Sequence, residues 1–137
     1  IKFDVAEKYA SKVSFTIDSI QRLKENETLE ISWNGKPINS KIKGNKSIEI
    51  IGKNNFKLTD VRVFNEKSQY IEITFSDPID ASQNLNGLIA FKNTSNTKFT
   101  YKVDNNIVTV YPKKSFKESV EIEVFSGIKN NDNWYIK

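Results

Sequence analysis

Apolar and polar residues alternate along most of this sequence. In "YIEITF", Ile71, Ile73 and Phe75 can face one way while Glu72 and Thr74 face the other. Successive side chains of a strand point to opposite faces, so this period of two predicts a strand with one buried face. The same pattern recurs at 13–17, 29–33, 48–50, 56–64, 70–75, 88–92, 99–103, 107–111 and 120–125. Short strands at this spacing, with no long helix between them, predict an all-β chain built on an antiparallel, Ig-like β-sandwich.

Turn-forming residues separate the predicted strands. Asn34-Gly35 is the strongest two-residue hairpin signal, because Asn and Gly tolerate the positive φ angles of a type I′ turn. "DNN", Asp104–Asn106, is expected to close a second hairpin. Helical patterns are confined to two short segments, Val5–Val13 and, more weakly, Ser19–Asn26, whose first serine could cap a helix.

The turn-rich segment "GKNN", Gly52–Asn55, is the best candidate for a domain boundary. A chain of 137 residues can form one medium domain or two small ones. The division predicts a β-rich unit over 1–54 and a complete sandwich over 55–137. The first unit is marginal in size for independent stability, so we expect it to be the C-terminal part of a domain that begins upstream. The chain contains no Met, which also suggests a piece of a longer or processed protein.

Residue types that are missing or scarce exclude several kinds of function. The sequence holds no Cys and no His, so it has no disulfide, no thiolate or imidazole metal ligand and no histidine general base. Of its 21 basic residues only Arg22 and Arg62 are arginines, and the lysines alternate with acidic residues. Nucleic-acid surfaces favour clustered arginine, so we expect no nucleic-acid binding. No apolar run reaches membrane-spanning length.

No pattern in the sequence indicates catalysis. No Gly-rich phosphate loop follows a strand, and no Ser, Lys or Asp has a suitable base at a recognisable spacing. Acid pairs such as Glu121 and Glu123 fall on one strand face, where solvated charge is the ordinary explanation. We therefore predict that the chain is not an enzyme and has no catalytic, cofactor-binding or metal-binding residues.

An acidic turn, "SDPID", follows the strand at 70–75. Calcium takes six to eight oxygens, and Asp77 and Asp80 alone supply too few. Pro78 cannot donate to a strand ladder, and the Ser and Asp side chains can bond nearby backbone amides, so a structural bend is favoured. One alternative stays open: a cation shared between this loop and "NNDN", Asn130–Asn133. That alternative predicts a calcium-dependent rise in melting temperature that a chelator reverses.

Exposed aromatic residues could form a sugar-binding platform. Trp33, Trp134 and Tyr135 are the candidates, but packing in a core or at a domain junction is the expected role for each. A row of these rings facing solvent would instead favour an Ig-like adhesin or glycan-binding module of a bacterial surface protein.

Several segments of Phe56–Lys137 resemble the first macroglobulin-like domain of bacterial alpha-2-macroglobulins. They are "FSDPID", "NLNGLIAF", "VTVYP" and the late "GIKN", in this order and spacing. The preceding part, with its "SWNGKPI" hairpin and "KSIEI" strand, resembles the β-rich segment just upstream in one subgroup of that family. The resemblance covers the chain from about Ser14 onward.

This resemblance implies a macroglobulin-like sandwich that belongs to a large protease-trapping protein of the bacterial cell envelope, periplasmic or lipid-anchored. In that family a protease cuts a bait region, the molecule changes shape, and a thioester can attach to the attacker. The thioester needs a Cys, which this chain lacks. The resemblance therefore implies a non-catalytic structural module whose partners are neighbouring domains of the same polypeptide, with target proteases as partners of the full-length parent.

Overall fold

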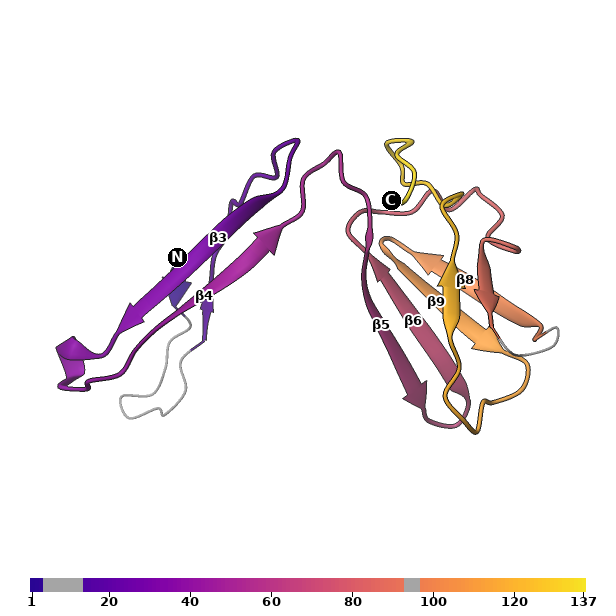
Figure 1. Ribbon diagram of the computed structural model, residues 1–137, viewed down its shortest axis with the longest axis horizontal. Helices are drawn as coiled ribbons and strands as arrows, with labels where there is room; N and C mark the ends of the chain where they lie inside the picture. The colour runs from indigo at the N-terminus through magenta and orange to yellow at the C-terminus, as the bar shows by residue number, and fades with distance from the viewer. Residues whose placement is uncertain (4–13, 93–96) are drawn as a thin grey trace.

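The computed structural model describes residues 1–3, 14–92 and 97–137, and these residues form an all-β structure (Figure 1). All pairs of strands within its sheets are antiparallel, as predicted. The strands are β1 (Lys2–Phe3), β2 (Phe15–Thr16), β3 (Glu27–Asn34), β4 (Lys43–Ile50), β5 (Leu58–Asn65), β6 (Gln69–Phe75), β7 (Ile89–Phe91), β8 (Phe99–Asp104), β9 (Ile107–Pro112) and β10 (Ile122–Val124).

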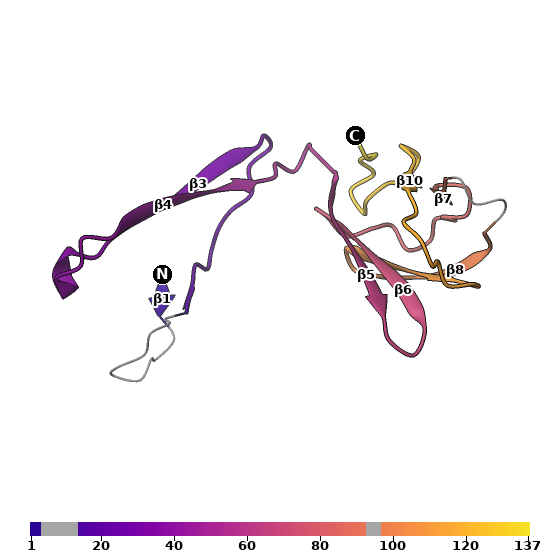
Figure 2. The same ribbon diagram turned by 60° about the horizontal axis from the view of Figure 1, so that its bottom comes forward.

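The C-terminal part is a β-sandwich. One sheet has the strand order β5-β6-β9-β8, and the facing sheet pairs β10 with β7 (Figures 1 and 2). The alternation read from the sequence explains the core, because Ile71, Ile73 and Phe75 of β6 all point into it. Burial of each such side chain contributes about 1.5–3 kcal/mol. The buried apolar residues are Phe56, Ile71, Ile73, Phe75, Ile79, Leu85, Ile89, Phe91, Val108, Val110, Ile128 and Ile136.

The predicted "DNN" hairpin joins β8 to β9. Asp104 pairs with Ile107, and Asn105 between them has a φ of 57°. Asn tolerates this left-handed conformation better than most residues, which explains its place in the turn. Phe75 is held next to this turn, because its N–H donates to the Asn106 carbonyl at 2.9 Å.

The N-terminal part contains an extended hairpin made of β3 and β4, seen as the long ribbon in Figures 1 and 2. The predicted type I′ turn at Asn34-Gly35 is wrong. Gly35 has a φ of −80°, and a 3-10 helix at Lys36–Ile38 follows it. In a two-residue hairpin Pro37 would stand in the returning strand, where it has no N–H to donate. The chain instead makes a wider loop, and pairing resumes with Lys43 opposite Asn34.

The predicted helix at Ser19–Asn26 is also wrong, since this segment is irregular until β3 begins at Glu27. Its carbonyl groups bond elsewhere: the N–H groups of Lys53 and Asn54 donate to the Leu23 and Lys24 oxygens at 2.8 and 3.0 Å. These bonds replace the ones a helix would make within itself. The Val5–Val13 helix falls outside the described residues. Across the described part of the chain, no helix is long and apolar enough to span a membrane.

The division of the chain at 54/55 stays a prediction. The strands β1–β4 precede that point and β5–β10 follow it. The segments that flank it are tied together by the side chain of Arg22, which makes the junction the most informative polar cluster in the described structure.

Candidate functional site

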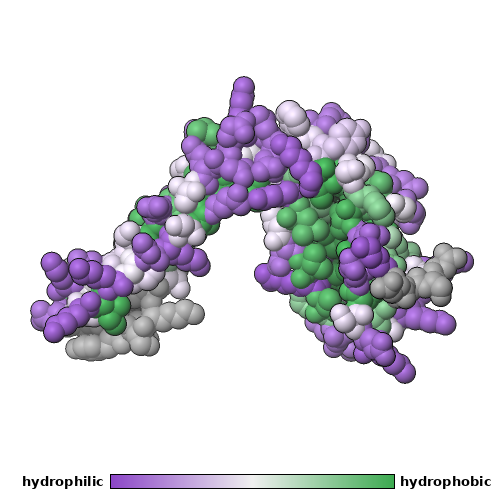
Figure 3. Space-filling view, viewed as in Figure 1, coloured by the Kyte–Doolittle hydropathy of each residue, from purple (hydrophilic) through white to green (hydrophobic). Residues whose placement is uncertain are grey.

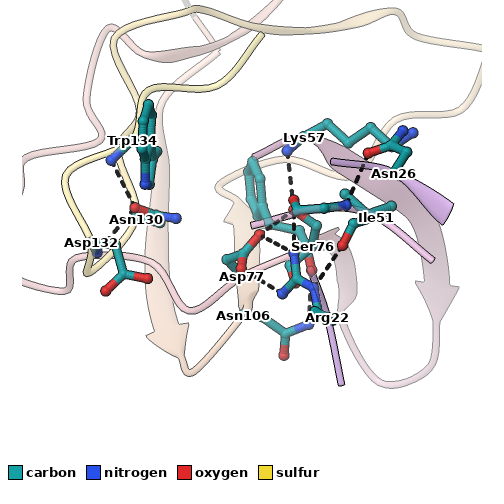
Figure 4. Close-up of polar contacts among 12 residues, drawn as sticks. Arg22, Asn26, Ile51, Lys57, Ser76, Asp77, Asn106, Asn130, Asp132 and Trp134 are labelled. Carbon is teal, nitrogen blue, oxygen red and sulfur yellow. Dashed lines mark hydrogen bonds and ion pairs between the residues drawn. The ribbon is translucent and has the colours of Figure 1, made fainter. Parts of the chain in front are cut away.

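Asp77, the first acid of the "SDPID" turn, is buried at the end of β6 and pairs with Arg22 (Figure 4). The guanidinium donates from Nη1 to Oδ1 at 2.6 Å and from Nη2 to Oδ2 at 3.2 Å. The Ser76 hydroxyl donates to Oδ2 at 2.5 Å. A two-pronged arginine–carboxylate pair has fixed geometry and is stronger than a neutral hydrogen bond. The carboxylate that the cation hypothesis needs is therefore already neutralised.

The same guanidinium also bonds the backbone on both sides of the junction. Its Nε donates to the Ile51 carbonyl at 2.7 Å, and Nη2 donates to the Gly52 carbonyl at 3.2 Å. Nη1 also reaches the Ser76 carbonyl at 3.3 Å. Only arginine carries enough donors in a planar fork to satisfy these acceptors together. We name this cluster of Arg22, Ile51, Gly52, Ser76 and Asp77 the Arg22 junction.

Gly52 makes the close approach of the chain at the junction possible. A Cβ atom on Gly52 would collide with the backbone of Lys24 and Glu25. The Gly52 N–H donates to Asn26 Oδ1 at 2.9 Å, and Asn55 Nδ2 donates to the same oxygen at 2.9 Å. The "GKNN" segment is thus held against the strand that starts beside it.

Ser76 joins the end of β6 to the start of β5. Its hydroxyl oxygen accepts from the Lys57 N–H at 3.1 Å, and its own N–H donates to the Lys57 carbonyl at 2.9 Å (Figure 4). The hydroxyl that donates to Asp77 therefore also accepts from the neighbouring strand. The junction is built into the sheet itself.

Asp80, the second acid of the turn, shapes the bend as predicted. Its Oδ1 accepts from the Ser82 N–H at 2.9 Å and from the Ser82 hydroxyl at 2.6 Å. Its Oδ2 lies 3.0 Å from Lys129 Nζ. The hydrogen bonds from Ser82 and then Lys129 lower the pKa of Asp80 to about 2.

The loops "SDPID" and "NNDN" lie side by side, as the cation hypothesis requires. Ile79 forms an isolated antiparallel β-bridge with Asn130, and the Asn131 N–H donates to the Pro78 carbonyl at 3.0 Å. However, Asn130 Oδ1 already accepts from the N–H groups of Asp132 and Trp134, at 3.0 and 2.8 Å (Figure 4).

The polar atoms between these loops suit a turn better than a cation. The side-chain nitrogen of Asn130 is buried with no partner among the described residues, and it is a donor, which a cation would repel. Nowhere in residues 1–3, 14–92 and 97–137 do three or more acidic, His or Cys side chains gather as a metal site. The contacts favour the structural bend.

Because the pKa of Asp80 is low, the unfolding free energy is expected to depend on pH in the acidic range. A carboxylate whose folded pKa is below its unfolded value of about 4 stabilises the fold above pH 4 and loses that contribution as pH falls toward 2. We expect the unfolding free energy to fall less between pH 4 and pH 2 in Asp80→Asn than in the wild type. Urea unfolding at each pH measures the difference. Equal slopes for the two proteins would contradict the assignment.

The aromatic residues singled out in the sequence are not in the core. Trp33 is 50% exposed, Trp134 45% and Tyr135 60%, so the expectation of core packing is wrong for all three. The Trp33 ring lies over Gly44, so a Cβ atom on residue 44 would collide with the ring. The ring also lines an apolar pocket with Ile1 and Ile31 among others. Packing at a domain junction stays a prediction for these residues.

Sequence reasoning missed a second aromatic cluster on the outer face of the sandwich. Phe64 and Tyr70 stack at 4.7 Å between ring centroids, and Tyr111 lies 6.1 Å from Tyr70. Phe64 pairs with Tyr70 across β5 and β6, so alternation alone could have placed both rings on one face once the pairing was known.

The residue that sequence reasoning missed most clearly is Arg22. It lies 55 positions from Asp77, and no local pattern relates the two. The one signal was compositional: Arg22 is one of only two arginines in a chain of 21 basic residues, which suggests a place that lysine cannot fill.

Comparisons of the chain with protein-family models, with curated proteins and with solved structures find no match.

Proposed function

We propose that this chain is a non-catalytic structural module of a bacterial alpha-2-macroglobulin-like protease-trapping protein of the cell envelope. The observation that carries the proposal is the Arg22 junction, in which one guanidinium makes two hydrogen bonds to the segment after the β3–β4 hairpin and three to the end of β6. A partly buried, charge-paired joint of this kind fixes the geometry of a scaffold. The charged groups of Arg22 and Asp77 are bound to each other in this joint.

The resemblance described for the sequence gives this joint a purpose. Macroglobulin-like domains follow one another in series, pack on one another and move as bodies. A module of that kind needs its own core, polar turns and a firm connection to its neighbour. The sandwich core and the Arg22 junction supply the first and the third of these.

The proposal is tested by comparing the isolated chain with its full-length parent. We expect the isolated chain to leave the cleavage of a protein substrate by a panel of endopeptidases unchanged. The parent should slow cleavage of that large substrate while the bound proteases still cleave a small peptide. Stoichiometric inhibition by the isolated chain would contradict the proposal, and so would a parent that never affects any protease.

A second candidate is an Ig-like adhesin or glycan-binding module of a bacterial surface protein. The half-exposed Trp33, Trp134 and Tyr135 side chains favour it, because exposed aromatic rings are the usual platforms for sugars. This candidate predicts binding on a glycan panel that is lost in Trp33→Ala or in Trp134→Ala. If neither variant changes the signal, or if no glycan binds, the candidate fails.

A further inference from the structure

Strand β5 has one unpaired edge, and its inner face is exposed at Val61 and Val63. In the described sheet it pairs only with β6, so the backbone groups along its other side lack strand partners. Val61 and Val63 lie opposite Ile73 and Ile71 and so share the inner face of the sheet with them. Yet Val61 is 40% exposed and Val63 is 55% exposed, whereas the two isoleucines are buried.

The facing sheet is too small to cover β5. It consists of β7 and β10, with three residues each. At the opposite edge of the large sheet, Phe99, Tyr101 and Val103 of β8 are partly buried against the core, whereas Val61 and Val63 of β5 are exposed. Figure 3 shows the result as an apolar area on the sandwich over β5 and β6. A long edge strand with exposed apolar residues is a template for pairing with another strand.

The outer face of β5 carries charges that can select the partner. Asp60 and Arg62 lie on this face, and Arg62 Nε is 2.6 Å from Asp60 Oδ2. When an antiparallel strand pairs with a copy of itself about a two-fold axis at Val61, position 60 of each copy lies opposite position 62 of the other. Each Asp60 then faces the Arg62 of the second copy, and Val61 faces Val61 on the inner side.

Neighbouring registers of the same pairing are electrostatically unfavourable. A shift of the axis to position 62 places the two Arg62 residues opposite each other, and a shift to position 60 does the same for the two Asp60 residues. Like charges directly opposite each other destabilise a strand pair. In the register about Val61, Asp60 and Arg62 of the two copies form a square in which each charge has opposite charges as its two nearest neighbours. The charges on β5 are therefore complementary to β5 itself in one register.

We propose that β5 binds β5 of a second copy of this chain, antiparallel about Val61, and joins the two four-stranded sheets into one continuous sheet. The pairing covers the apolar strip of Val61 and Val63 and satisfies the free backbone edge. The contact is short, so the dimer is weak and forms with rising concentration. The interface is isologous, as a two-fold axis requires.

The test is sedimentation of the 137-residue chain over a wide concentration range. We expect the average mass to rise from that of one chain toward that of two. Asp60→Lys and Arg62→Glu should each remain monomeric, because each makes the square all of one sign. An equimolar mixture of the two variants should regain the dimer. In the mixed pair, the new positive charge at position 60 of one chain faces the new negative charge at position 62 of the other, while Arg62 faces Asp60.

A matched control lies on β8, the other edge of the same sheet. Lys102 and Asp104 form a similar exposed pair, 3.7 Å apart, so Lys102→Glu makes an equivalent charge change and should leave dimerisation unchanged. A wild type that stays monomeric at every concentration overturns the proposal, and so does a dimer that only Lys102→Glu disrupts. Hydrogen exchange on the wild type gives an independent readout. The exchange rates of the amides on the free edge of β5 should fall as the concentration rises. Unchanged exchange rates in a dimer also overturn the proposal.

Discussion

Replacing Arg22 by Ala is expected to lower the unfolding free energy by about 3 kcal/mol, the lower end of the range for breaking a buried ion pair, because Asp77 is buried while Arg22 is partly exposed. Asp77 would be left in a buried position without its partner, and the carbonyls of Ile51 and Gly52 would lose their donor. Arg22→Lys should recover only part of the loss, because one ammonium cannot bond the carboxylate and both carbonyls together. Urea unfolding measures each value.

Two comparisons separate the junction from ordinary surface charge. Lys92 pairs with Glu121 at 2.7 Å, but both side chains are exposed, so Lys92→Ala should cost no more than about 1 kcal/mol. The double variant Arg22→Met with Asp77→Asn should be less destabilised than Arg22→Ala, since it removes the buried charge along with its partner. A similar small loss for Arg22→Ala and Lys92→Ala would show that the junction does not hold the structure together.

Truncation of Phe75 to Ala is expected to cost about 3–5 kcal/mol, because the ring is almost fully buried at the centre of the core. The ring stacks on Phe56 with 5.7 Å between centroids, so the change also removes contacts from the segment that leads into β5. A loss of this size is a large part of the total stability of about 5–15 kcal/mol that a domain has. The urea midpoint should fall with little change in slope.

Phe125→Ala is the matched control for the core variant. The same side chain is removed, but this ring is 44% exposed, and the backbone bond from Phe125 to Leu88 survives the change. We expect a loss of no more than about 1 kcal/mol. If the two Phe variants lose equal stability, the core does not lie where the structure places it.

Much of the fold could be predicted because strand burial is a local property. The alternation of Ile71, Ile73 and Phe75 with polar neighbours specifies a strand and its buried face without knowledge of the rest of the chain. One of the two errors arose where a local signal met a distant partner, and the other where a neighbouring residue opposed the signal. The carbonyls at 23 and 24 bond the segment after β4 instead of forming a helix, and Pro37 disfavours the tight turn that Asn34-Gly35 alone would favour.

The polar cluster was predicted only in part. That Asp80 would bond a nearby amide follows from the turn chemistry of Asp two residues before Ser82. That Asp77 would bind Arg22 depends on how two segments far apart in sequence meet, and alternation carries no information about that. The exposed inner face of β5 was unpredictable for the same reason, since the pattern of Val61 and Val63 is that of a buried strand.

Phe56 and the segment 136–137, which are far apart in the sequence, meet at one pole of the sandwich. The Lys137 N–H donates to the Phe56 carbonyl at 3.2 Å, and Ile136 is buried in the same core as Phe56. A short linker could therefore join these two segments in an engineered, circularly permuted version of the sandwich. The same proximity means that a host protein could carry the sandwich as a graft in a surface loop without stretching its own backbone.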